Sequence, residues 1–197
     1  GASTAYHLAQ SGCTDVLVVD QGPLFDTGGS TSHAPGGVFQ VNYSKTMTEF
    51  ARYSTQLYSG LESDGLPAWY PVGSLEVAWS NERLIDLRRK LGVARSWGVA
   101  ADLLSPQHAN DLIPLLSSQI QGALHVPSDG IARAVRAVEA MASDSESMGV
   151  EFVGNVVVTG FDIVDGRIRG LQTSKGSIEA EQILIATGIW APTTGAM

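Results

Sequence analysis

Residues 1–20 read GASTAYHLAQSGCTDVLVVD, and this stretch decides the fold. Residues 2–11 carry small and apolar side chains at helical spacing, and Gly12 follows as a stop signal, so a helix is predicted there. Residues 15–20 are aliphatic between two acids, which is typical of a strand buried on both faces of a parallel sheet. A helix followed by such a strand is the second half of a βαβ unit, whose first strand we expect before Gly1.

The rest of the chain predicts a long loop, a mixed middle section and an antiparallel meander. Residues 21–44 are rich in Gly, Ser, Thr and Pro and are predicted to form one loop, of a length that is usually functional. The helices expected downstream are 45–61, 84–91 with a stop at Gly92, 106–112, and 131–148 with Ile131 on its apolar face. The strands expected are 72–78, 122–126, 150–153, 156–164, 167–173, 177–180 and a buried return strand at 183–186.

This order of elements favours one α/β architecture over another. A meander inserted before a buried return strand is unlike a plain NAD-binding Rossmann domain and resembles the FAD-binding Rossmann domains of the glutathione-reductase-like group. We expect residues 1–44 and 131–197 to be the two parts of that domain. Residues 45–130 are expected to lead into a mixed α+β substrate domain, and the chain is expected to be truncated at both ends.

Composition excludes several classes of protein. The chain has 197 residues, 44% of them hydrophobic, and a net charge of −8 with only 12 Lys and Arg that form no patch in the sequence. We therefore expect a globular protein without a nucleic-acid partner. The apolar runs have the length of strands, so no membrane span is expected. The single cysteine, Cys13, cannot form an internal disulfide.

A dinucleotide site is indicated by the spacing of Gly1 and Asp20. A glycine that opens a helix and an acid that closes the next strand about 20 residues later match the ribose-binding arrangement of dinucleotide folds. Gly1 would then be the last glycine of a phosphate-binding fingerprint. The alternative is that a glycine and an acid occur at these common positions for structural reasons alone.

The loop 28–37, with the sequence GGSTSHAPGG, is the most informative segment. Glycines at both ends allow the backbone to approach a large ligand, and three consecutive hydroxyl residues offer hydrogen-bond donors. His33 stands in the middle, and imidazole can act as a neutral nucleophile near pH 7. The alternative is a flexible loop with a solvated histidine. For the other histidines, His7, His108 and His125, solvated or packed positions are expected, and no metal-ligand spacing is present.

The same segments resemble a known enzyme family. The loop 28–36, residues 20–24 (DQGPL), the string HVPSDG at 125–130 and the string ATGIW at 186–190 are similar to the dimethylglycine oxidase, dimethylglycine dehydrogenase and sarcosine dehydrogenase family. The resemblance extends over essentially the whole chain.

This resemblance implies a cofactor site, residue by residue. His33 matches the histidine that bonds covalently to the 8α-methyl carbon of FAD, and Asp20 matches the acid on the adenosine ribose. The other cofactor-binding residues implied are Gln21, Ser30, Thr31, Ser32, Gly37, Val158, Thr187 and Gly188, in addition to Gly1, which the spacing to Asp20 indicates.

The resemblance also implies an activity, namely oxidation of a small N-methylated amino acid such as dimethylglycine or sarcosine by hydride transfer to flavin. The iminium would give formaldehyde or pass its carbon to tetrahydrofolate in a downstream folate domain. Catalytic residues are expected after Met197, and the compartment would be the cytoplasm or, in a eukaryote, the mitochondrial matrix. The alternatives are a flavin enzyme for another secondary amine or a D-amino acid, and a non-catalytic FAD-binding subunit.

Overall fold

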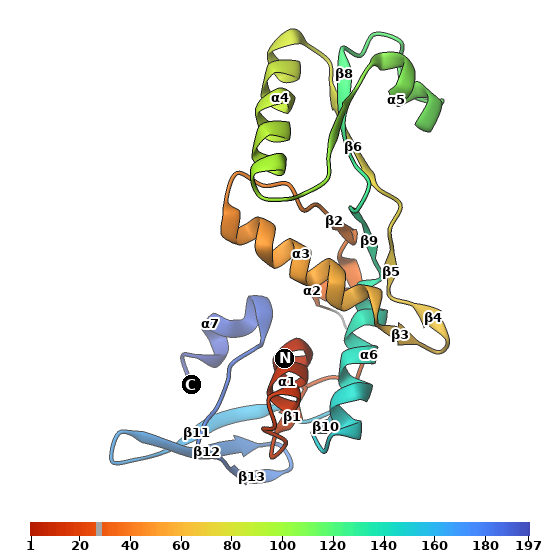
Figure 1. Ribbon diagram of the computed structural model, residues 1–197. Helices are drawn as coiled ribbons and strands as arrows, with labels where there is room; N and C mark the ends of the chain where they lie inside the picture. The colour runs from red at the N-terminus through yellow and green to blue at the C-terminus, as the bar shows by residue number, and fades with distance from the viewer. Residues whose placement is uncertain (27–28) are drawn as a thin grey trace. The chain divides into compact units, whose positions relative to one another are not determined.

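The computed structural model describes residues 1–26 and 29–197, which form two compact units. The first unit combines Gly1–Ala34 with Ala134–Met197, and the second is the continuous segment Pro35–Arg133. The second unit is therefore an insertion in the chain of the first. Figure 1 labels most of the elements of both units.

The first unit is built around a parallel pair of strands and two helices. Strand β1 pairs with β10 in parallel, with Leu17 opposite Glu151. Helices α1 and α6 pack together, and the core of the unit includes the buried Ala5, Ala9 and Val150. The elements before the insertion are α1 (Ala2–Gln10), β1 (Leu17–Val19) and α2 (Ser30–His33). Those after it begin with α6 (Ala134–Ser147) and β10 (Glu151–Val153).

The meander follows β10 as an antiparallel sheet in the order β11-β12-β13. Its strands are β11 (Val158–Val164), β12 (Arg167–Thr173) and β13 (Gly176–Glu179), and the chain then ends in η1 (Gly188–Trp190) and α7 (Ala191–Thr194). Asp165 and Gly166 form the first turn, both with positive φ (52° and 72°), as the Asp-Gly pair of a tight hairpin requires. The predicted meander is confirmed.

The second unit contains a three-stranded antiparallel sheet, in the order β6-β8-β7, with a helix on each face. Leu87 of helix α4 packs with Leu124 of β8 in one core cluster, whereas Ala109 of α5 packs with Ala123 in another. Alternate residues of β8 thus face opposite helices, as a strand covered on both sides requires. The bounds are β6 (Ser74–Ala78), α4 (Asn81–Ser96), β7 (Asp102–Leu104), α5 (Pro106–Leu112) and β8 (Gly122–Val126).

The remaining elements of the second unit are helix α3 and two small sheets. Strands β2, β9 and β5 form one sheet in the order β2-β9-β5, and β3 pairs with β4 in a hairpin. The bounds are β2 (Gly37–Val38), α3 (Lys45–Ser59), β3 (Glu62–Ser63), β4 (Leu66–Pro67), β5 (Trp69–Tyr70) and β9 (Gly130–Ala132).

Two predictions were wrong because tertiary packing outweighed a local signal. Helix α4 continues through Gly92 to Ser96, although a glycine inside a helix costs about 1 kcal/mol. The buried Ala94 beyond it recovers this cost by packing in the core. Ile131 lies in strand β9 and not in the long helix, because it pairs with Gly37 and Tyr70 on either side.

Three further expectations, about two strands and one loop, were wrong. Residues 183–186 form no strand, Leu184 is 65% exposed, and no described strand pairs with them. Strand β1 is parallel as predicted, but it is not buried on both faces, since Leu17 is 42% exposed. The predicted loop 21–44 contains α2 and β2; Thr27 and Gly28, within that loop, lie outside the described residues.

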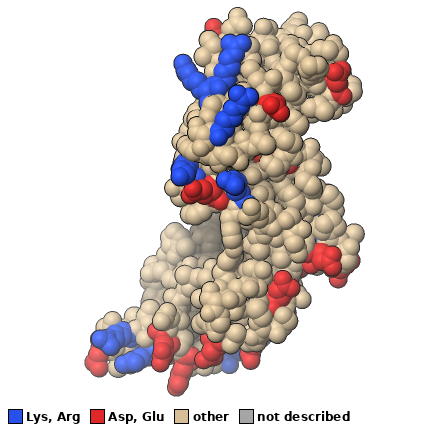
Figure 2. Space-filling view, in the orientation of Figure 1, with Lys and Arg blue, Asp and Glu red and all other residues tan. Residues whose placement is uncertain are grey.

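Charge is distributed unevenly over the molecule. Helix α4 carries five basic residues, and Figure 2 shows basic side chains gathered over this part of the view. Two of the five are neutralised, because Arg83 and Lys90 form ion pairs with Glu76, and Arg83 also pairs with Asp86. The basic residues are thus more clustered than the sequence indicated. Among the described helices, none is long and apolar enough to cross a membrane.

The core position of Leu87 gives the first prediction. We expect Leu87→Ala to lower the free energy of unfolding by about 2–5 kcal/mol, because the side chain is 0% exposed and its removal leaves a cavity. Ile85→Ala on the same helix, at a side chain that is 46% exposed, is the matched control and should change it by less than about 0.5 kcal/mol. Urea denaturation followed by circular dichroism measures both. Equal losses in the two variants would contradict the packing described for α4.

Candidate cofactor site

The first turn of helix α1 lies beside β1 and the chain at residue 186. Gly1 is the N-cap residue of α1 and makes no side-chain cap hydrogen bond. A Cβ built on it would lie 3.9 Å from Ala186 Cβ and 4.0 Å from Val18 Cγ1, which is ordinary van der Waals contact. The packing of the protein alone therefore does not require glycine here. A need for glycine would come from a ligand that approaches the backbone.

Asp20 follows the carboxyl end of β1, where its backbone is held on both sides. Its N–H donates to the carbonyl of Val153 (3.0 Å), and its carbonyl accepts from the N–H of Val156 (2.9 Å). The side chain is exposed, and its Oδ1 accepts one hydrogen bond, from the Gly22 N–H at 2.9 Å. The other carboxylate oxygen makes no hydrogen bond among the described residues. This leaves an acceptor at the carboxyl end of a parallel strand, the position at which α/β folds bind ligands. Gln21, next in the chain, is also exposed.

His33 is the last residue of the one-turn helix α2, and its ring is held by the start of the same turn. Nδ1 lies 3.0 Å from the carbonyl oxygen of Gly29 and 3.1 Å from Ser32 Oγ, and this hydroxyl also donates to the Gly29 carbonyl at 3.1 Å. A carbonyl oxygen can only accept, so the Nδ1–Gly29 hydrogen bond requires the proton on Nδ1. In the neutral ring Nε2 then carries the lone pair. His33 is exposed, so this nitrogen is accessible to a ligand.

The chain around residue 188 lies next to the beginning of α2. A Cβ built on Gly29 would lie 3.7 Å from Cζ3 of Trp190, so the indole ring stands beside the residue that holds His33. The turn before it is closed by the Trp190 N–H, which donates to the Thr187 carbonyl at 3.0 Å, and by Gly188 at φ +55°. Trp190 was not among the residues expected at the site. Its place in the string ATGIW was the available signal.

The predicted site residues thus fall mostly in one unit. Those in the first unit are Gly1, Asp20, Gln21, Ser30, Thr31, Ser32, His33, Val158, Thr187 and Gly188. Val158 opens β11 and is half-buried opposite Thr173. The structure brings α2 beside η1, and Gly1 beside Ala186. Gly37 lies in the second unit, where it pairs with Ile131.

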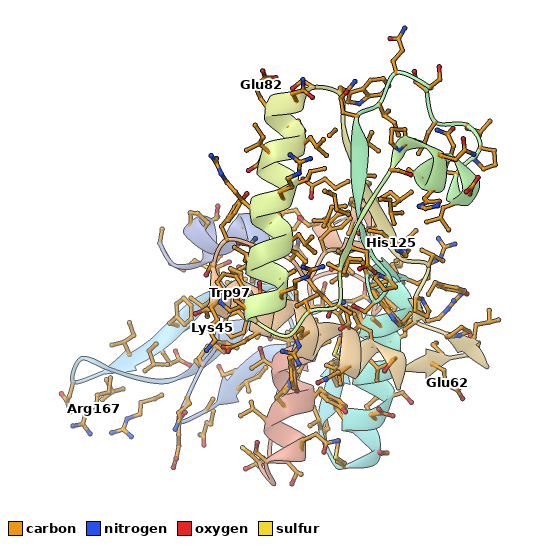
Figure 3. All side chains as sticks on the ribbon, turned by 45° about the horizontal axis from the view of Figure 1, so that its top comes forward. Lys45, Glu62, Glu82, Trp97, His125 and Arg167 are labelled. Carbon is orange, nitrogen blue, oxygen red and sulfur yellow. The ribbon has the colours of Figure 1, made fainter. Side chains whose placement is uncertain are left out.

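The remaining histidines take no part in this arrangement. His125, labelled in Figure 3, is a half-buried residue of β8, and its Nε2 lies 3.2 Å from the position of a Cβ built on Gly73. The predicted packing role of His125 is consistent with this contact. His7 Nδ1 donates to the Ser3 carbonyl oxygen at 2.6 Å, within α1. No group of three potential metal ligands occurs among the described residues.

All 197 residues match the model of one protein family, "FAD dependent oxidoreductase" (DAO). The chain belongs to this family. The expected resemblance is therefore confirmed, and the residues described above belong to an FAD-dependent oxidoreductase domain.

Relatives of this family include enzymes that act on methylated amines and one regulatory protein. The chain is 32% identical to the mitochondrial pyruvate dehydrogenase phosphatase regulatory subunit of Mus musculus over 99% of its length. It is 33% identical to 4-methylaminobutanoate oxidase (formaldehyde-forming) of Paenarthrobacter nicotinovorans over 96%, and 29% identical to human mitochondrial sarcosine dehydrogenase over 100%. It spans 22%, 23% and 22% of these proteins, respectively, which is less than a quarter of each.

A solved structure confirms the fold. L-proline dehydrogenase from P. horikoshii superposes with a TM-score of 0.86 at 25% identity, and the match covers 100% of this chain and 52% of that one. The expected α/β fold of an FAD-dependent oxidoreductase is therefore correct. About half of the L-proline dehydrogenase chain lies outside the matched region.

The hydrogen bond from His33 to Gly29 gives the second prediction. At pH 8.5, with no flavin bound, we expect the neutral ring of His33 to carry its proton on Nδ1, whereas an unconstrained imidazole favours Nε2–H. Two-dimensional ¹H–¹⁵N correlation spectra of the ring nitrogens distinguish the two tautomers. His108 is the internal reference, because its ring makes no hydrogen bond among the described residues. An Nε2–H form at His33 would contradict the arrangement of α2.

Proposed function

We propose that the protein containing this chain oxidises the N-methyl group of a small N-methylated amino acid, using FAD bound covalently to His33. The observation that carries the proposal is the accessible lone pair on His33 Nε2, which follows from the bond between Nδ1 and the Gly29 carbonyl. The substrate class is supported by relatives named for sarcosine and for 4-methylaminobutanoate. Both of these compounds are N-methylated amino acids.

The described residues are suited to hold FAD. The carboxylate of Asp20 has a free oxygen for a ribose hydroxyl, with Gln21 beside it. Gly1 presents the first turn of α1 without a side chain in the way, as close approach of a pyrophosphate requires. The other residues assigned to the cofactor are Ser30, Thr31 and Ser32 at α2, Gly37, the backbone of Val158, and Thr187 with Gly188.

Attachment at His33 has a simple balance of atoms and electrons. His33 would hold FAD through Nε2: a bond from Nε2 to the 8α-carbon would replace one C–H bond of that methyl group, whose proton would leave, and the two electrons would be taken up by the flavin and removed by dioxygen. In this scheme the Gly29 carbonyl keeps the Nδ1 proton in place, so that Nε2 remains the nucleophile.

Bound FAD supplies the hydride acceptor for amine oxidation. Loss of hydride from an N-methyl carbon converts the substrate into an iminium, which water splits into formaldehyde and the demethylated amine. Transfer of the carbon to tetrahydrofolate would replace hydrolysis if a folate domain follows. The residues that face the substrate are assigned to the chain after Met197.

A non-catalytic FAD-binding subunit is the second candidate. One specific observation favours it, namely the 32% identity to a protein named as a regulatory subunit. The two candidates share the flavin site and differ in whether an amine reduces the flavin. A flavin enzyme for another secondary amine is distinguished from the first candidate by its substrate alone.

Covalent attachment is tested by the mass of the acid-denatured full-length protein. We expect a mass increase corresponding to one FAD in the wild type and its absence in His33→Ala, because the variant lacks the nucleophilic nitrogen. His108→Ala should keep the adduct, since His108 is exposed on α5 in the second unit. A wild-type protein without an adduct would show that His33 does not anchor the flavin.

The substrate is tested by anaerobic bleaching of the flavin absorbance. We expect sarcosine or dimethylglycine to bleach it within seconds to minutes at millimolar concentration, and glycine, which has no N-methyl group, to leave it oxidised. Bleaching by L-proline or a D-amino acid alone would assign another amine substrate. Dithionite reduction without any response to amines would favour the regulatory subunit.

A further inference from the structure

Helix α2, which carries His33, is too short to be stable by itself. It has four residues and no side-chain cap at Gly29, and a helix of one turn does not form in isolation. Gly29 also has a wide choice of backbone conformations, because glycine has no Cβ. The order of this turn must therefore come from its neighbours in the first unit. Helix α6 packs against α2, and the indole of Trp190 lies beside Gly29.

The backbone of Trp190 is held on both sides by threonines. Its N–H donates to the Thr187 carbonyl at 3.0 Å, and its carbonyl accepts from Thr194 Oγ1 at 3.2 Å. The two threonine hydroxyls lie 3.3 Å apart, so they join the start of η1 to α7. Gly188 allows the turn because its φ is +55°, a conformation that favours glycine. The indole is thus presented from a backbone segment that its own hydrogen bonds hold together.

The indole lies beside the residue whose carbonyl holds the ring of His33. Its Cζ3 atom is 3.7 Å from the position of a Cβ built on Gly29, which is van der Waals distance. The Gly29 carbonyl accepts from His33 Nδ1 at 3.0 Å and from Ser32 Oγ at 3.1 Å. Rotation of the Gly29 peptide would break both bonds and remove the constraint on the tautomer of His33. An aromatic ring beside Gly29 restricts that rotation.

We propose that Trp190 is a positioning residue for flavin attachment: its indole fixes Gly29, whose carbonyl keeps the proton of His33 on Nδ1 and leaves Nε2 as the nucleophile. The inference rests on the proposed covalent attachment. Trp190 acts through the backbone of Gly29 and is assigned no contact with the flavin. All the residues in this series of contacts belong to the first unit.

The test uses two substitutions in the full-length protein, alone and combined. Trp190→Ala removes the ring and leaves Gly29 unrestricted. Gly29→Ala adds a Cβ at an extended backbone conformation that alanine can adopt (φ −93°, ψ −170°), so it restricts the backbone without the indole. With Trp190 present, the added Cβ makes an ordinary van der Waals contact, and we expect no loss. In the Trp190→Ala background, Gly29→Ala should act as a rescue.

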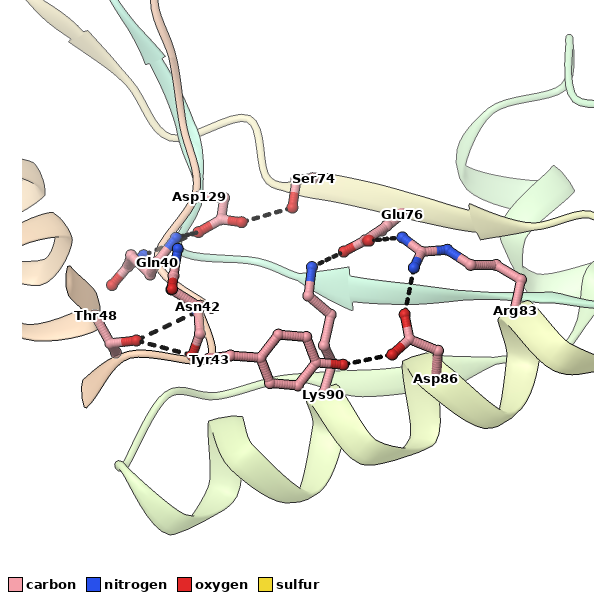
Figure 4. A network of polar contacts seen from close by, with 10 residues as sticks. All are labelled: Gln40, Asn42, Tyr43, Thr48, Ser74, Glu76, Arg83, Asp86, Lys90 and Asp129. Atoms are coloured by element: carbon pink, nitrogen blue, oxygen red, sulfur yellow. Dashed lines mark hydrogen bonds and ion pairs between the residues drawn. The ribbon is translucent and has the colours of Figure 1, made fainter. Parts of the chain in front are cut away.

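Two variants in the second unit are the controls. Trp79→Ala makes the same substitution at a tryptophan that is 62% exposed. Ser74→Ala controls for a general loss of stability, because Ser74 Oγ donates at 2.6 Å to the carboxylate of Asp129, which is 1% exposed (Figure 4). The same carboxylate accepts from the Gln40 N–H at 2.9 Å. A buried acceptor that loses its donor destabilises the unit that contains it.

Two readouts separate positioning from stability. The first is the rate at which added FAD becomes covalent, followed as flavin that stays with acid-precipitated protein. The second is the tautomer of His33 in the flavin-free protein, from ¹H–¹⁵N spectra recorded where the ring is neutral. For Trp190→Ala we expect the rate to fall about tenfold and the ring to shift towards Nε2–H, since a packing contact is lost.

The rescue and the controls have expected sizes. Gly29→Ala should raise the rate of Trp190→Ala by about two- to fivefold, because alanine has fewer backbone conformations than glycine. It should also return the His33 ring towards Nδ1–H. Trp79→Ala and Ser74→Ala should stay within about twofold of the wild type, as substitutions at independent sites do.

Each result decides the proposal. An unchanged His33 tautomer in Trp190→Ala, no rescue by Gly29→Ala, or an equal loss in Ser74→Ala would overturn it. If Trp190→Ala does not fold, Trp190→Phe, with its smaller ring, takes its place: a partial loss in both readouts supports the proposal, and wild-type values overturn it. If the wild type has no covalent flavin, the attachment at His33 is wrong, and the tautomer alone then decides whether Trp190 fixes Gly29.

Discussion

The parallel pairing of β1 with β10 is the interaction on which the first unit depends. It joins residues 17–19 to residues 151–153, and the whole of the second unit lies between these two segments in the sequence. The pairing continues beyond the strands, because the Asp20 backbone bonds to Val153 and Val156. Close packing reinforces it, since a Cβ on Gly154 would lie 2.9 Å from the Gly22 carbonyl oxygen. Asp20 is therefore held at the carboxyl end of β1 by residues more than a hundred positions away.

Local signals in the sequence were sufficient for much of the fold. Helix α5 begins at the predicted Ser105-Pro106 pair, with Ser105 Oγ accepting from the His108 N–H, and the β11–β12 hairpin turns at Asp165-Gly166. Errors arose where partners decided the outcome. Gly92 lies inside α4 because the helix is packed on both sides of it, and residues 183–186 form no strand because no described strand pairs with them.

The site was predictable to the extent that its residues are neighbours in sequence. The string around His33 pointed to an attachment loop, and the Gly1–Asp20 spacing pointed to a dinucleotide. The sequence could not predict that Nδ1 of His33 bonds to Gly29, because this depends on α2 forming a helical turn inside an expected loop. Nor could it predict the bond between Gln40 and Asp129, whose partners are 89 residues apart.

The insertion of one unit within the other has a consequence for synthesis of the protein. The second unit is complete once Arg133 has left the ribosome, whereas the first must wait for β10 and the meander. Domains generally fold as units during translation, and closing a long loop costs entropy that grows only slowly with length. A second unit that is already folded replaces about a hundred flexible residues by a compact body. Folding of the second unit first therefore lowers the entropy cost of pairing β1 with β10.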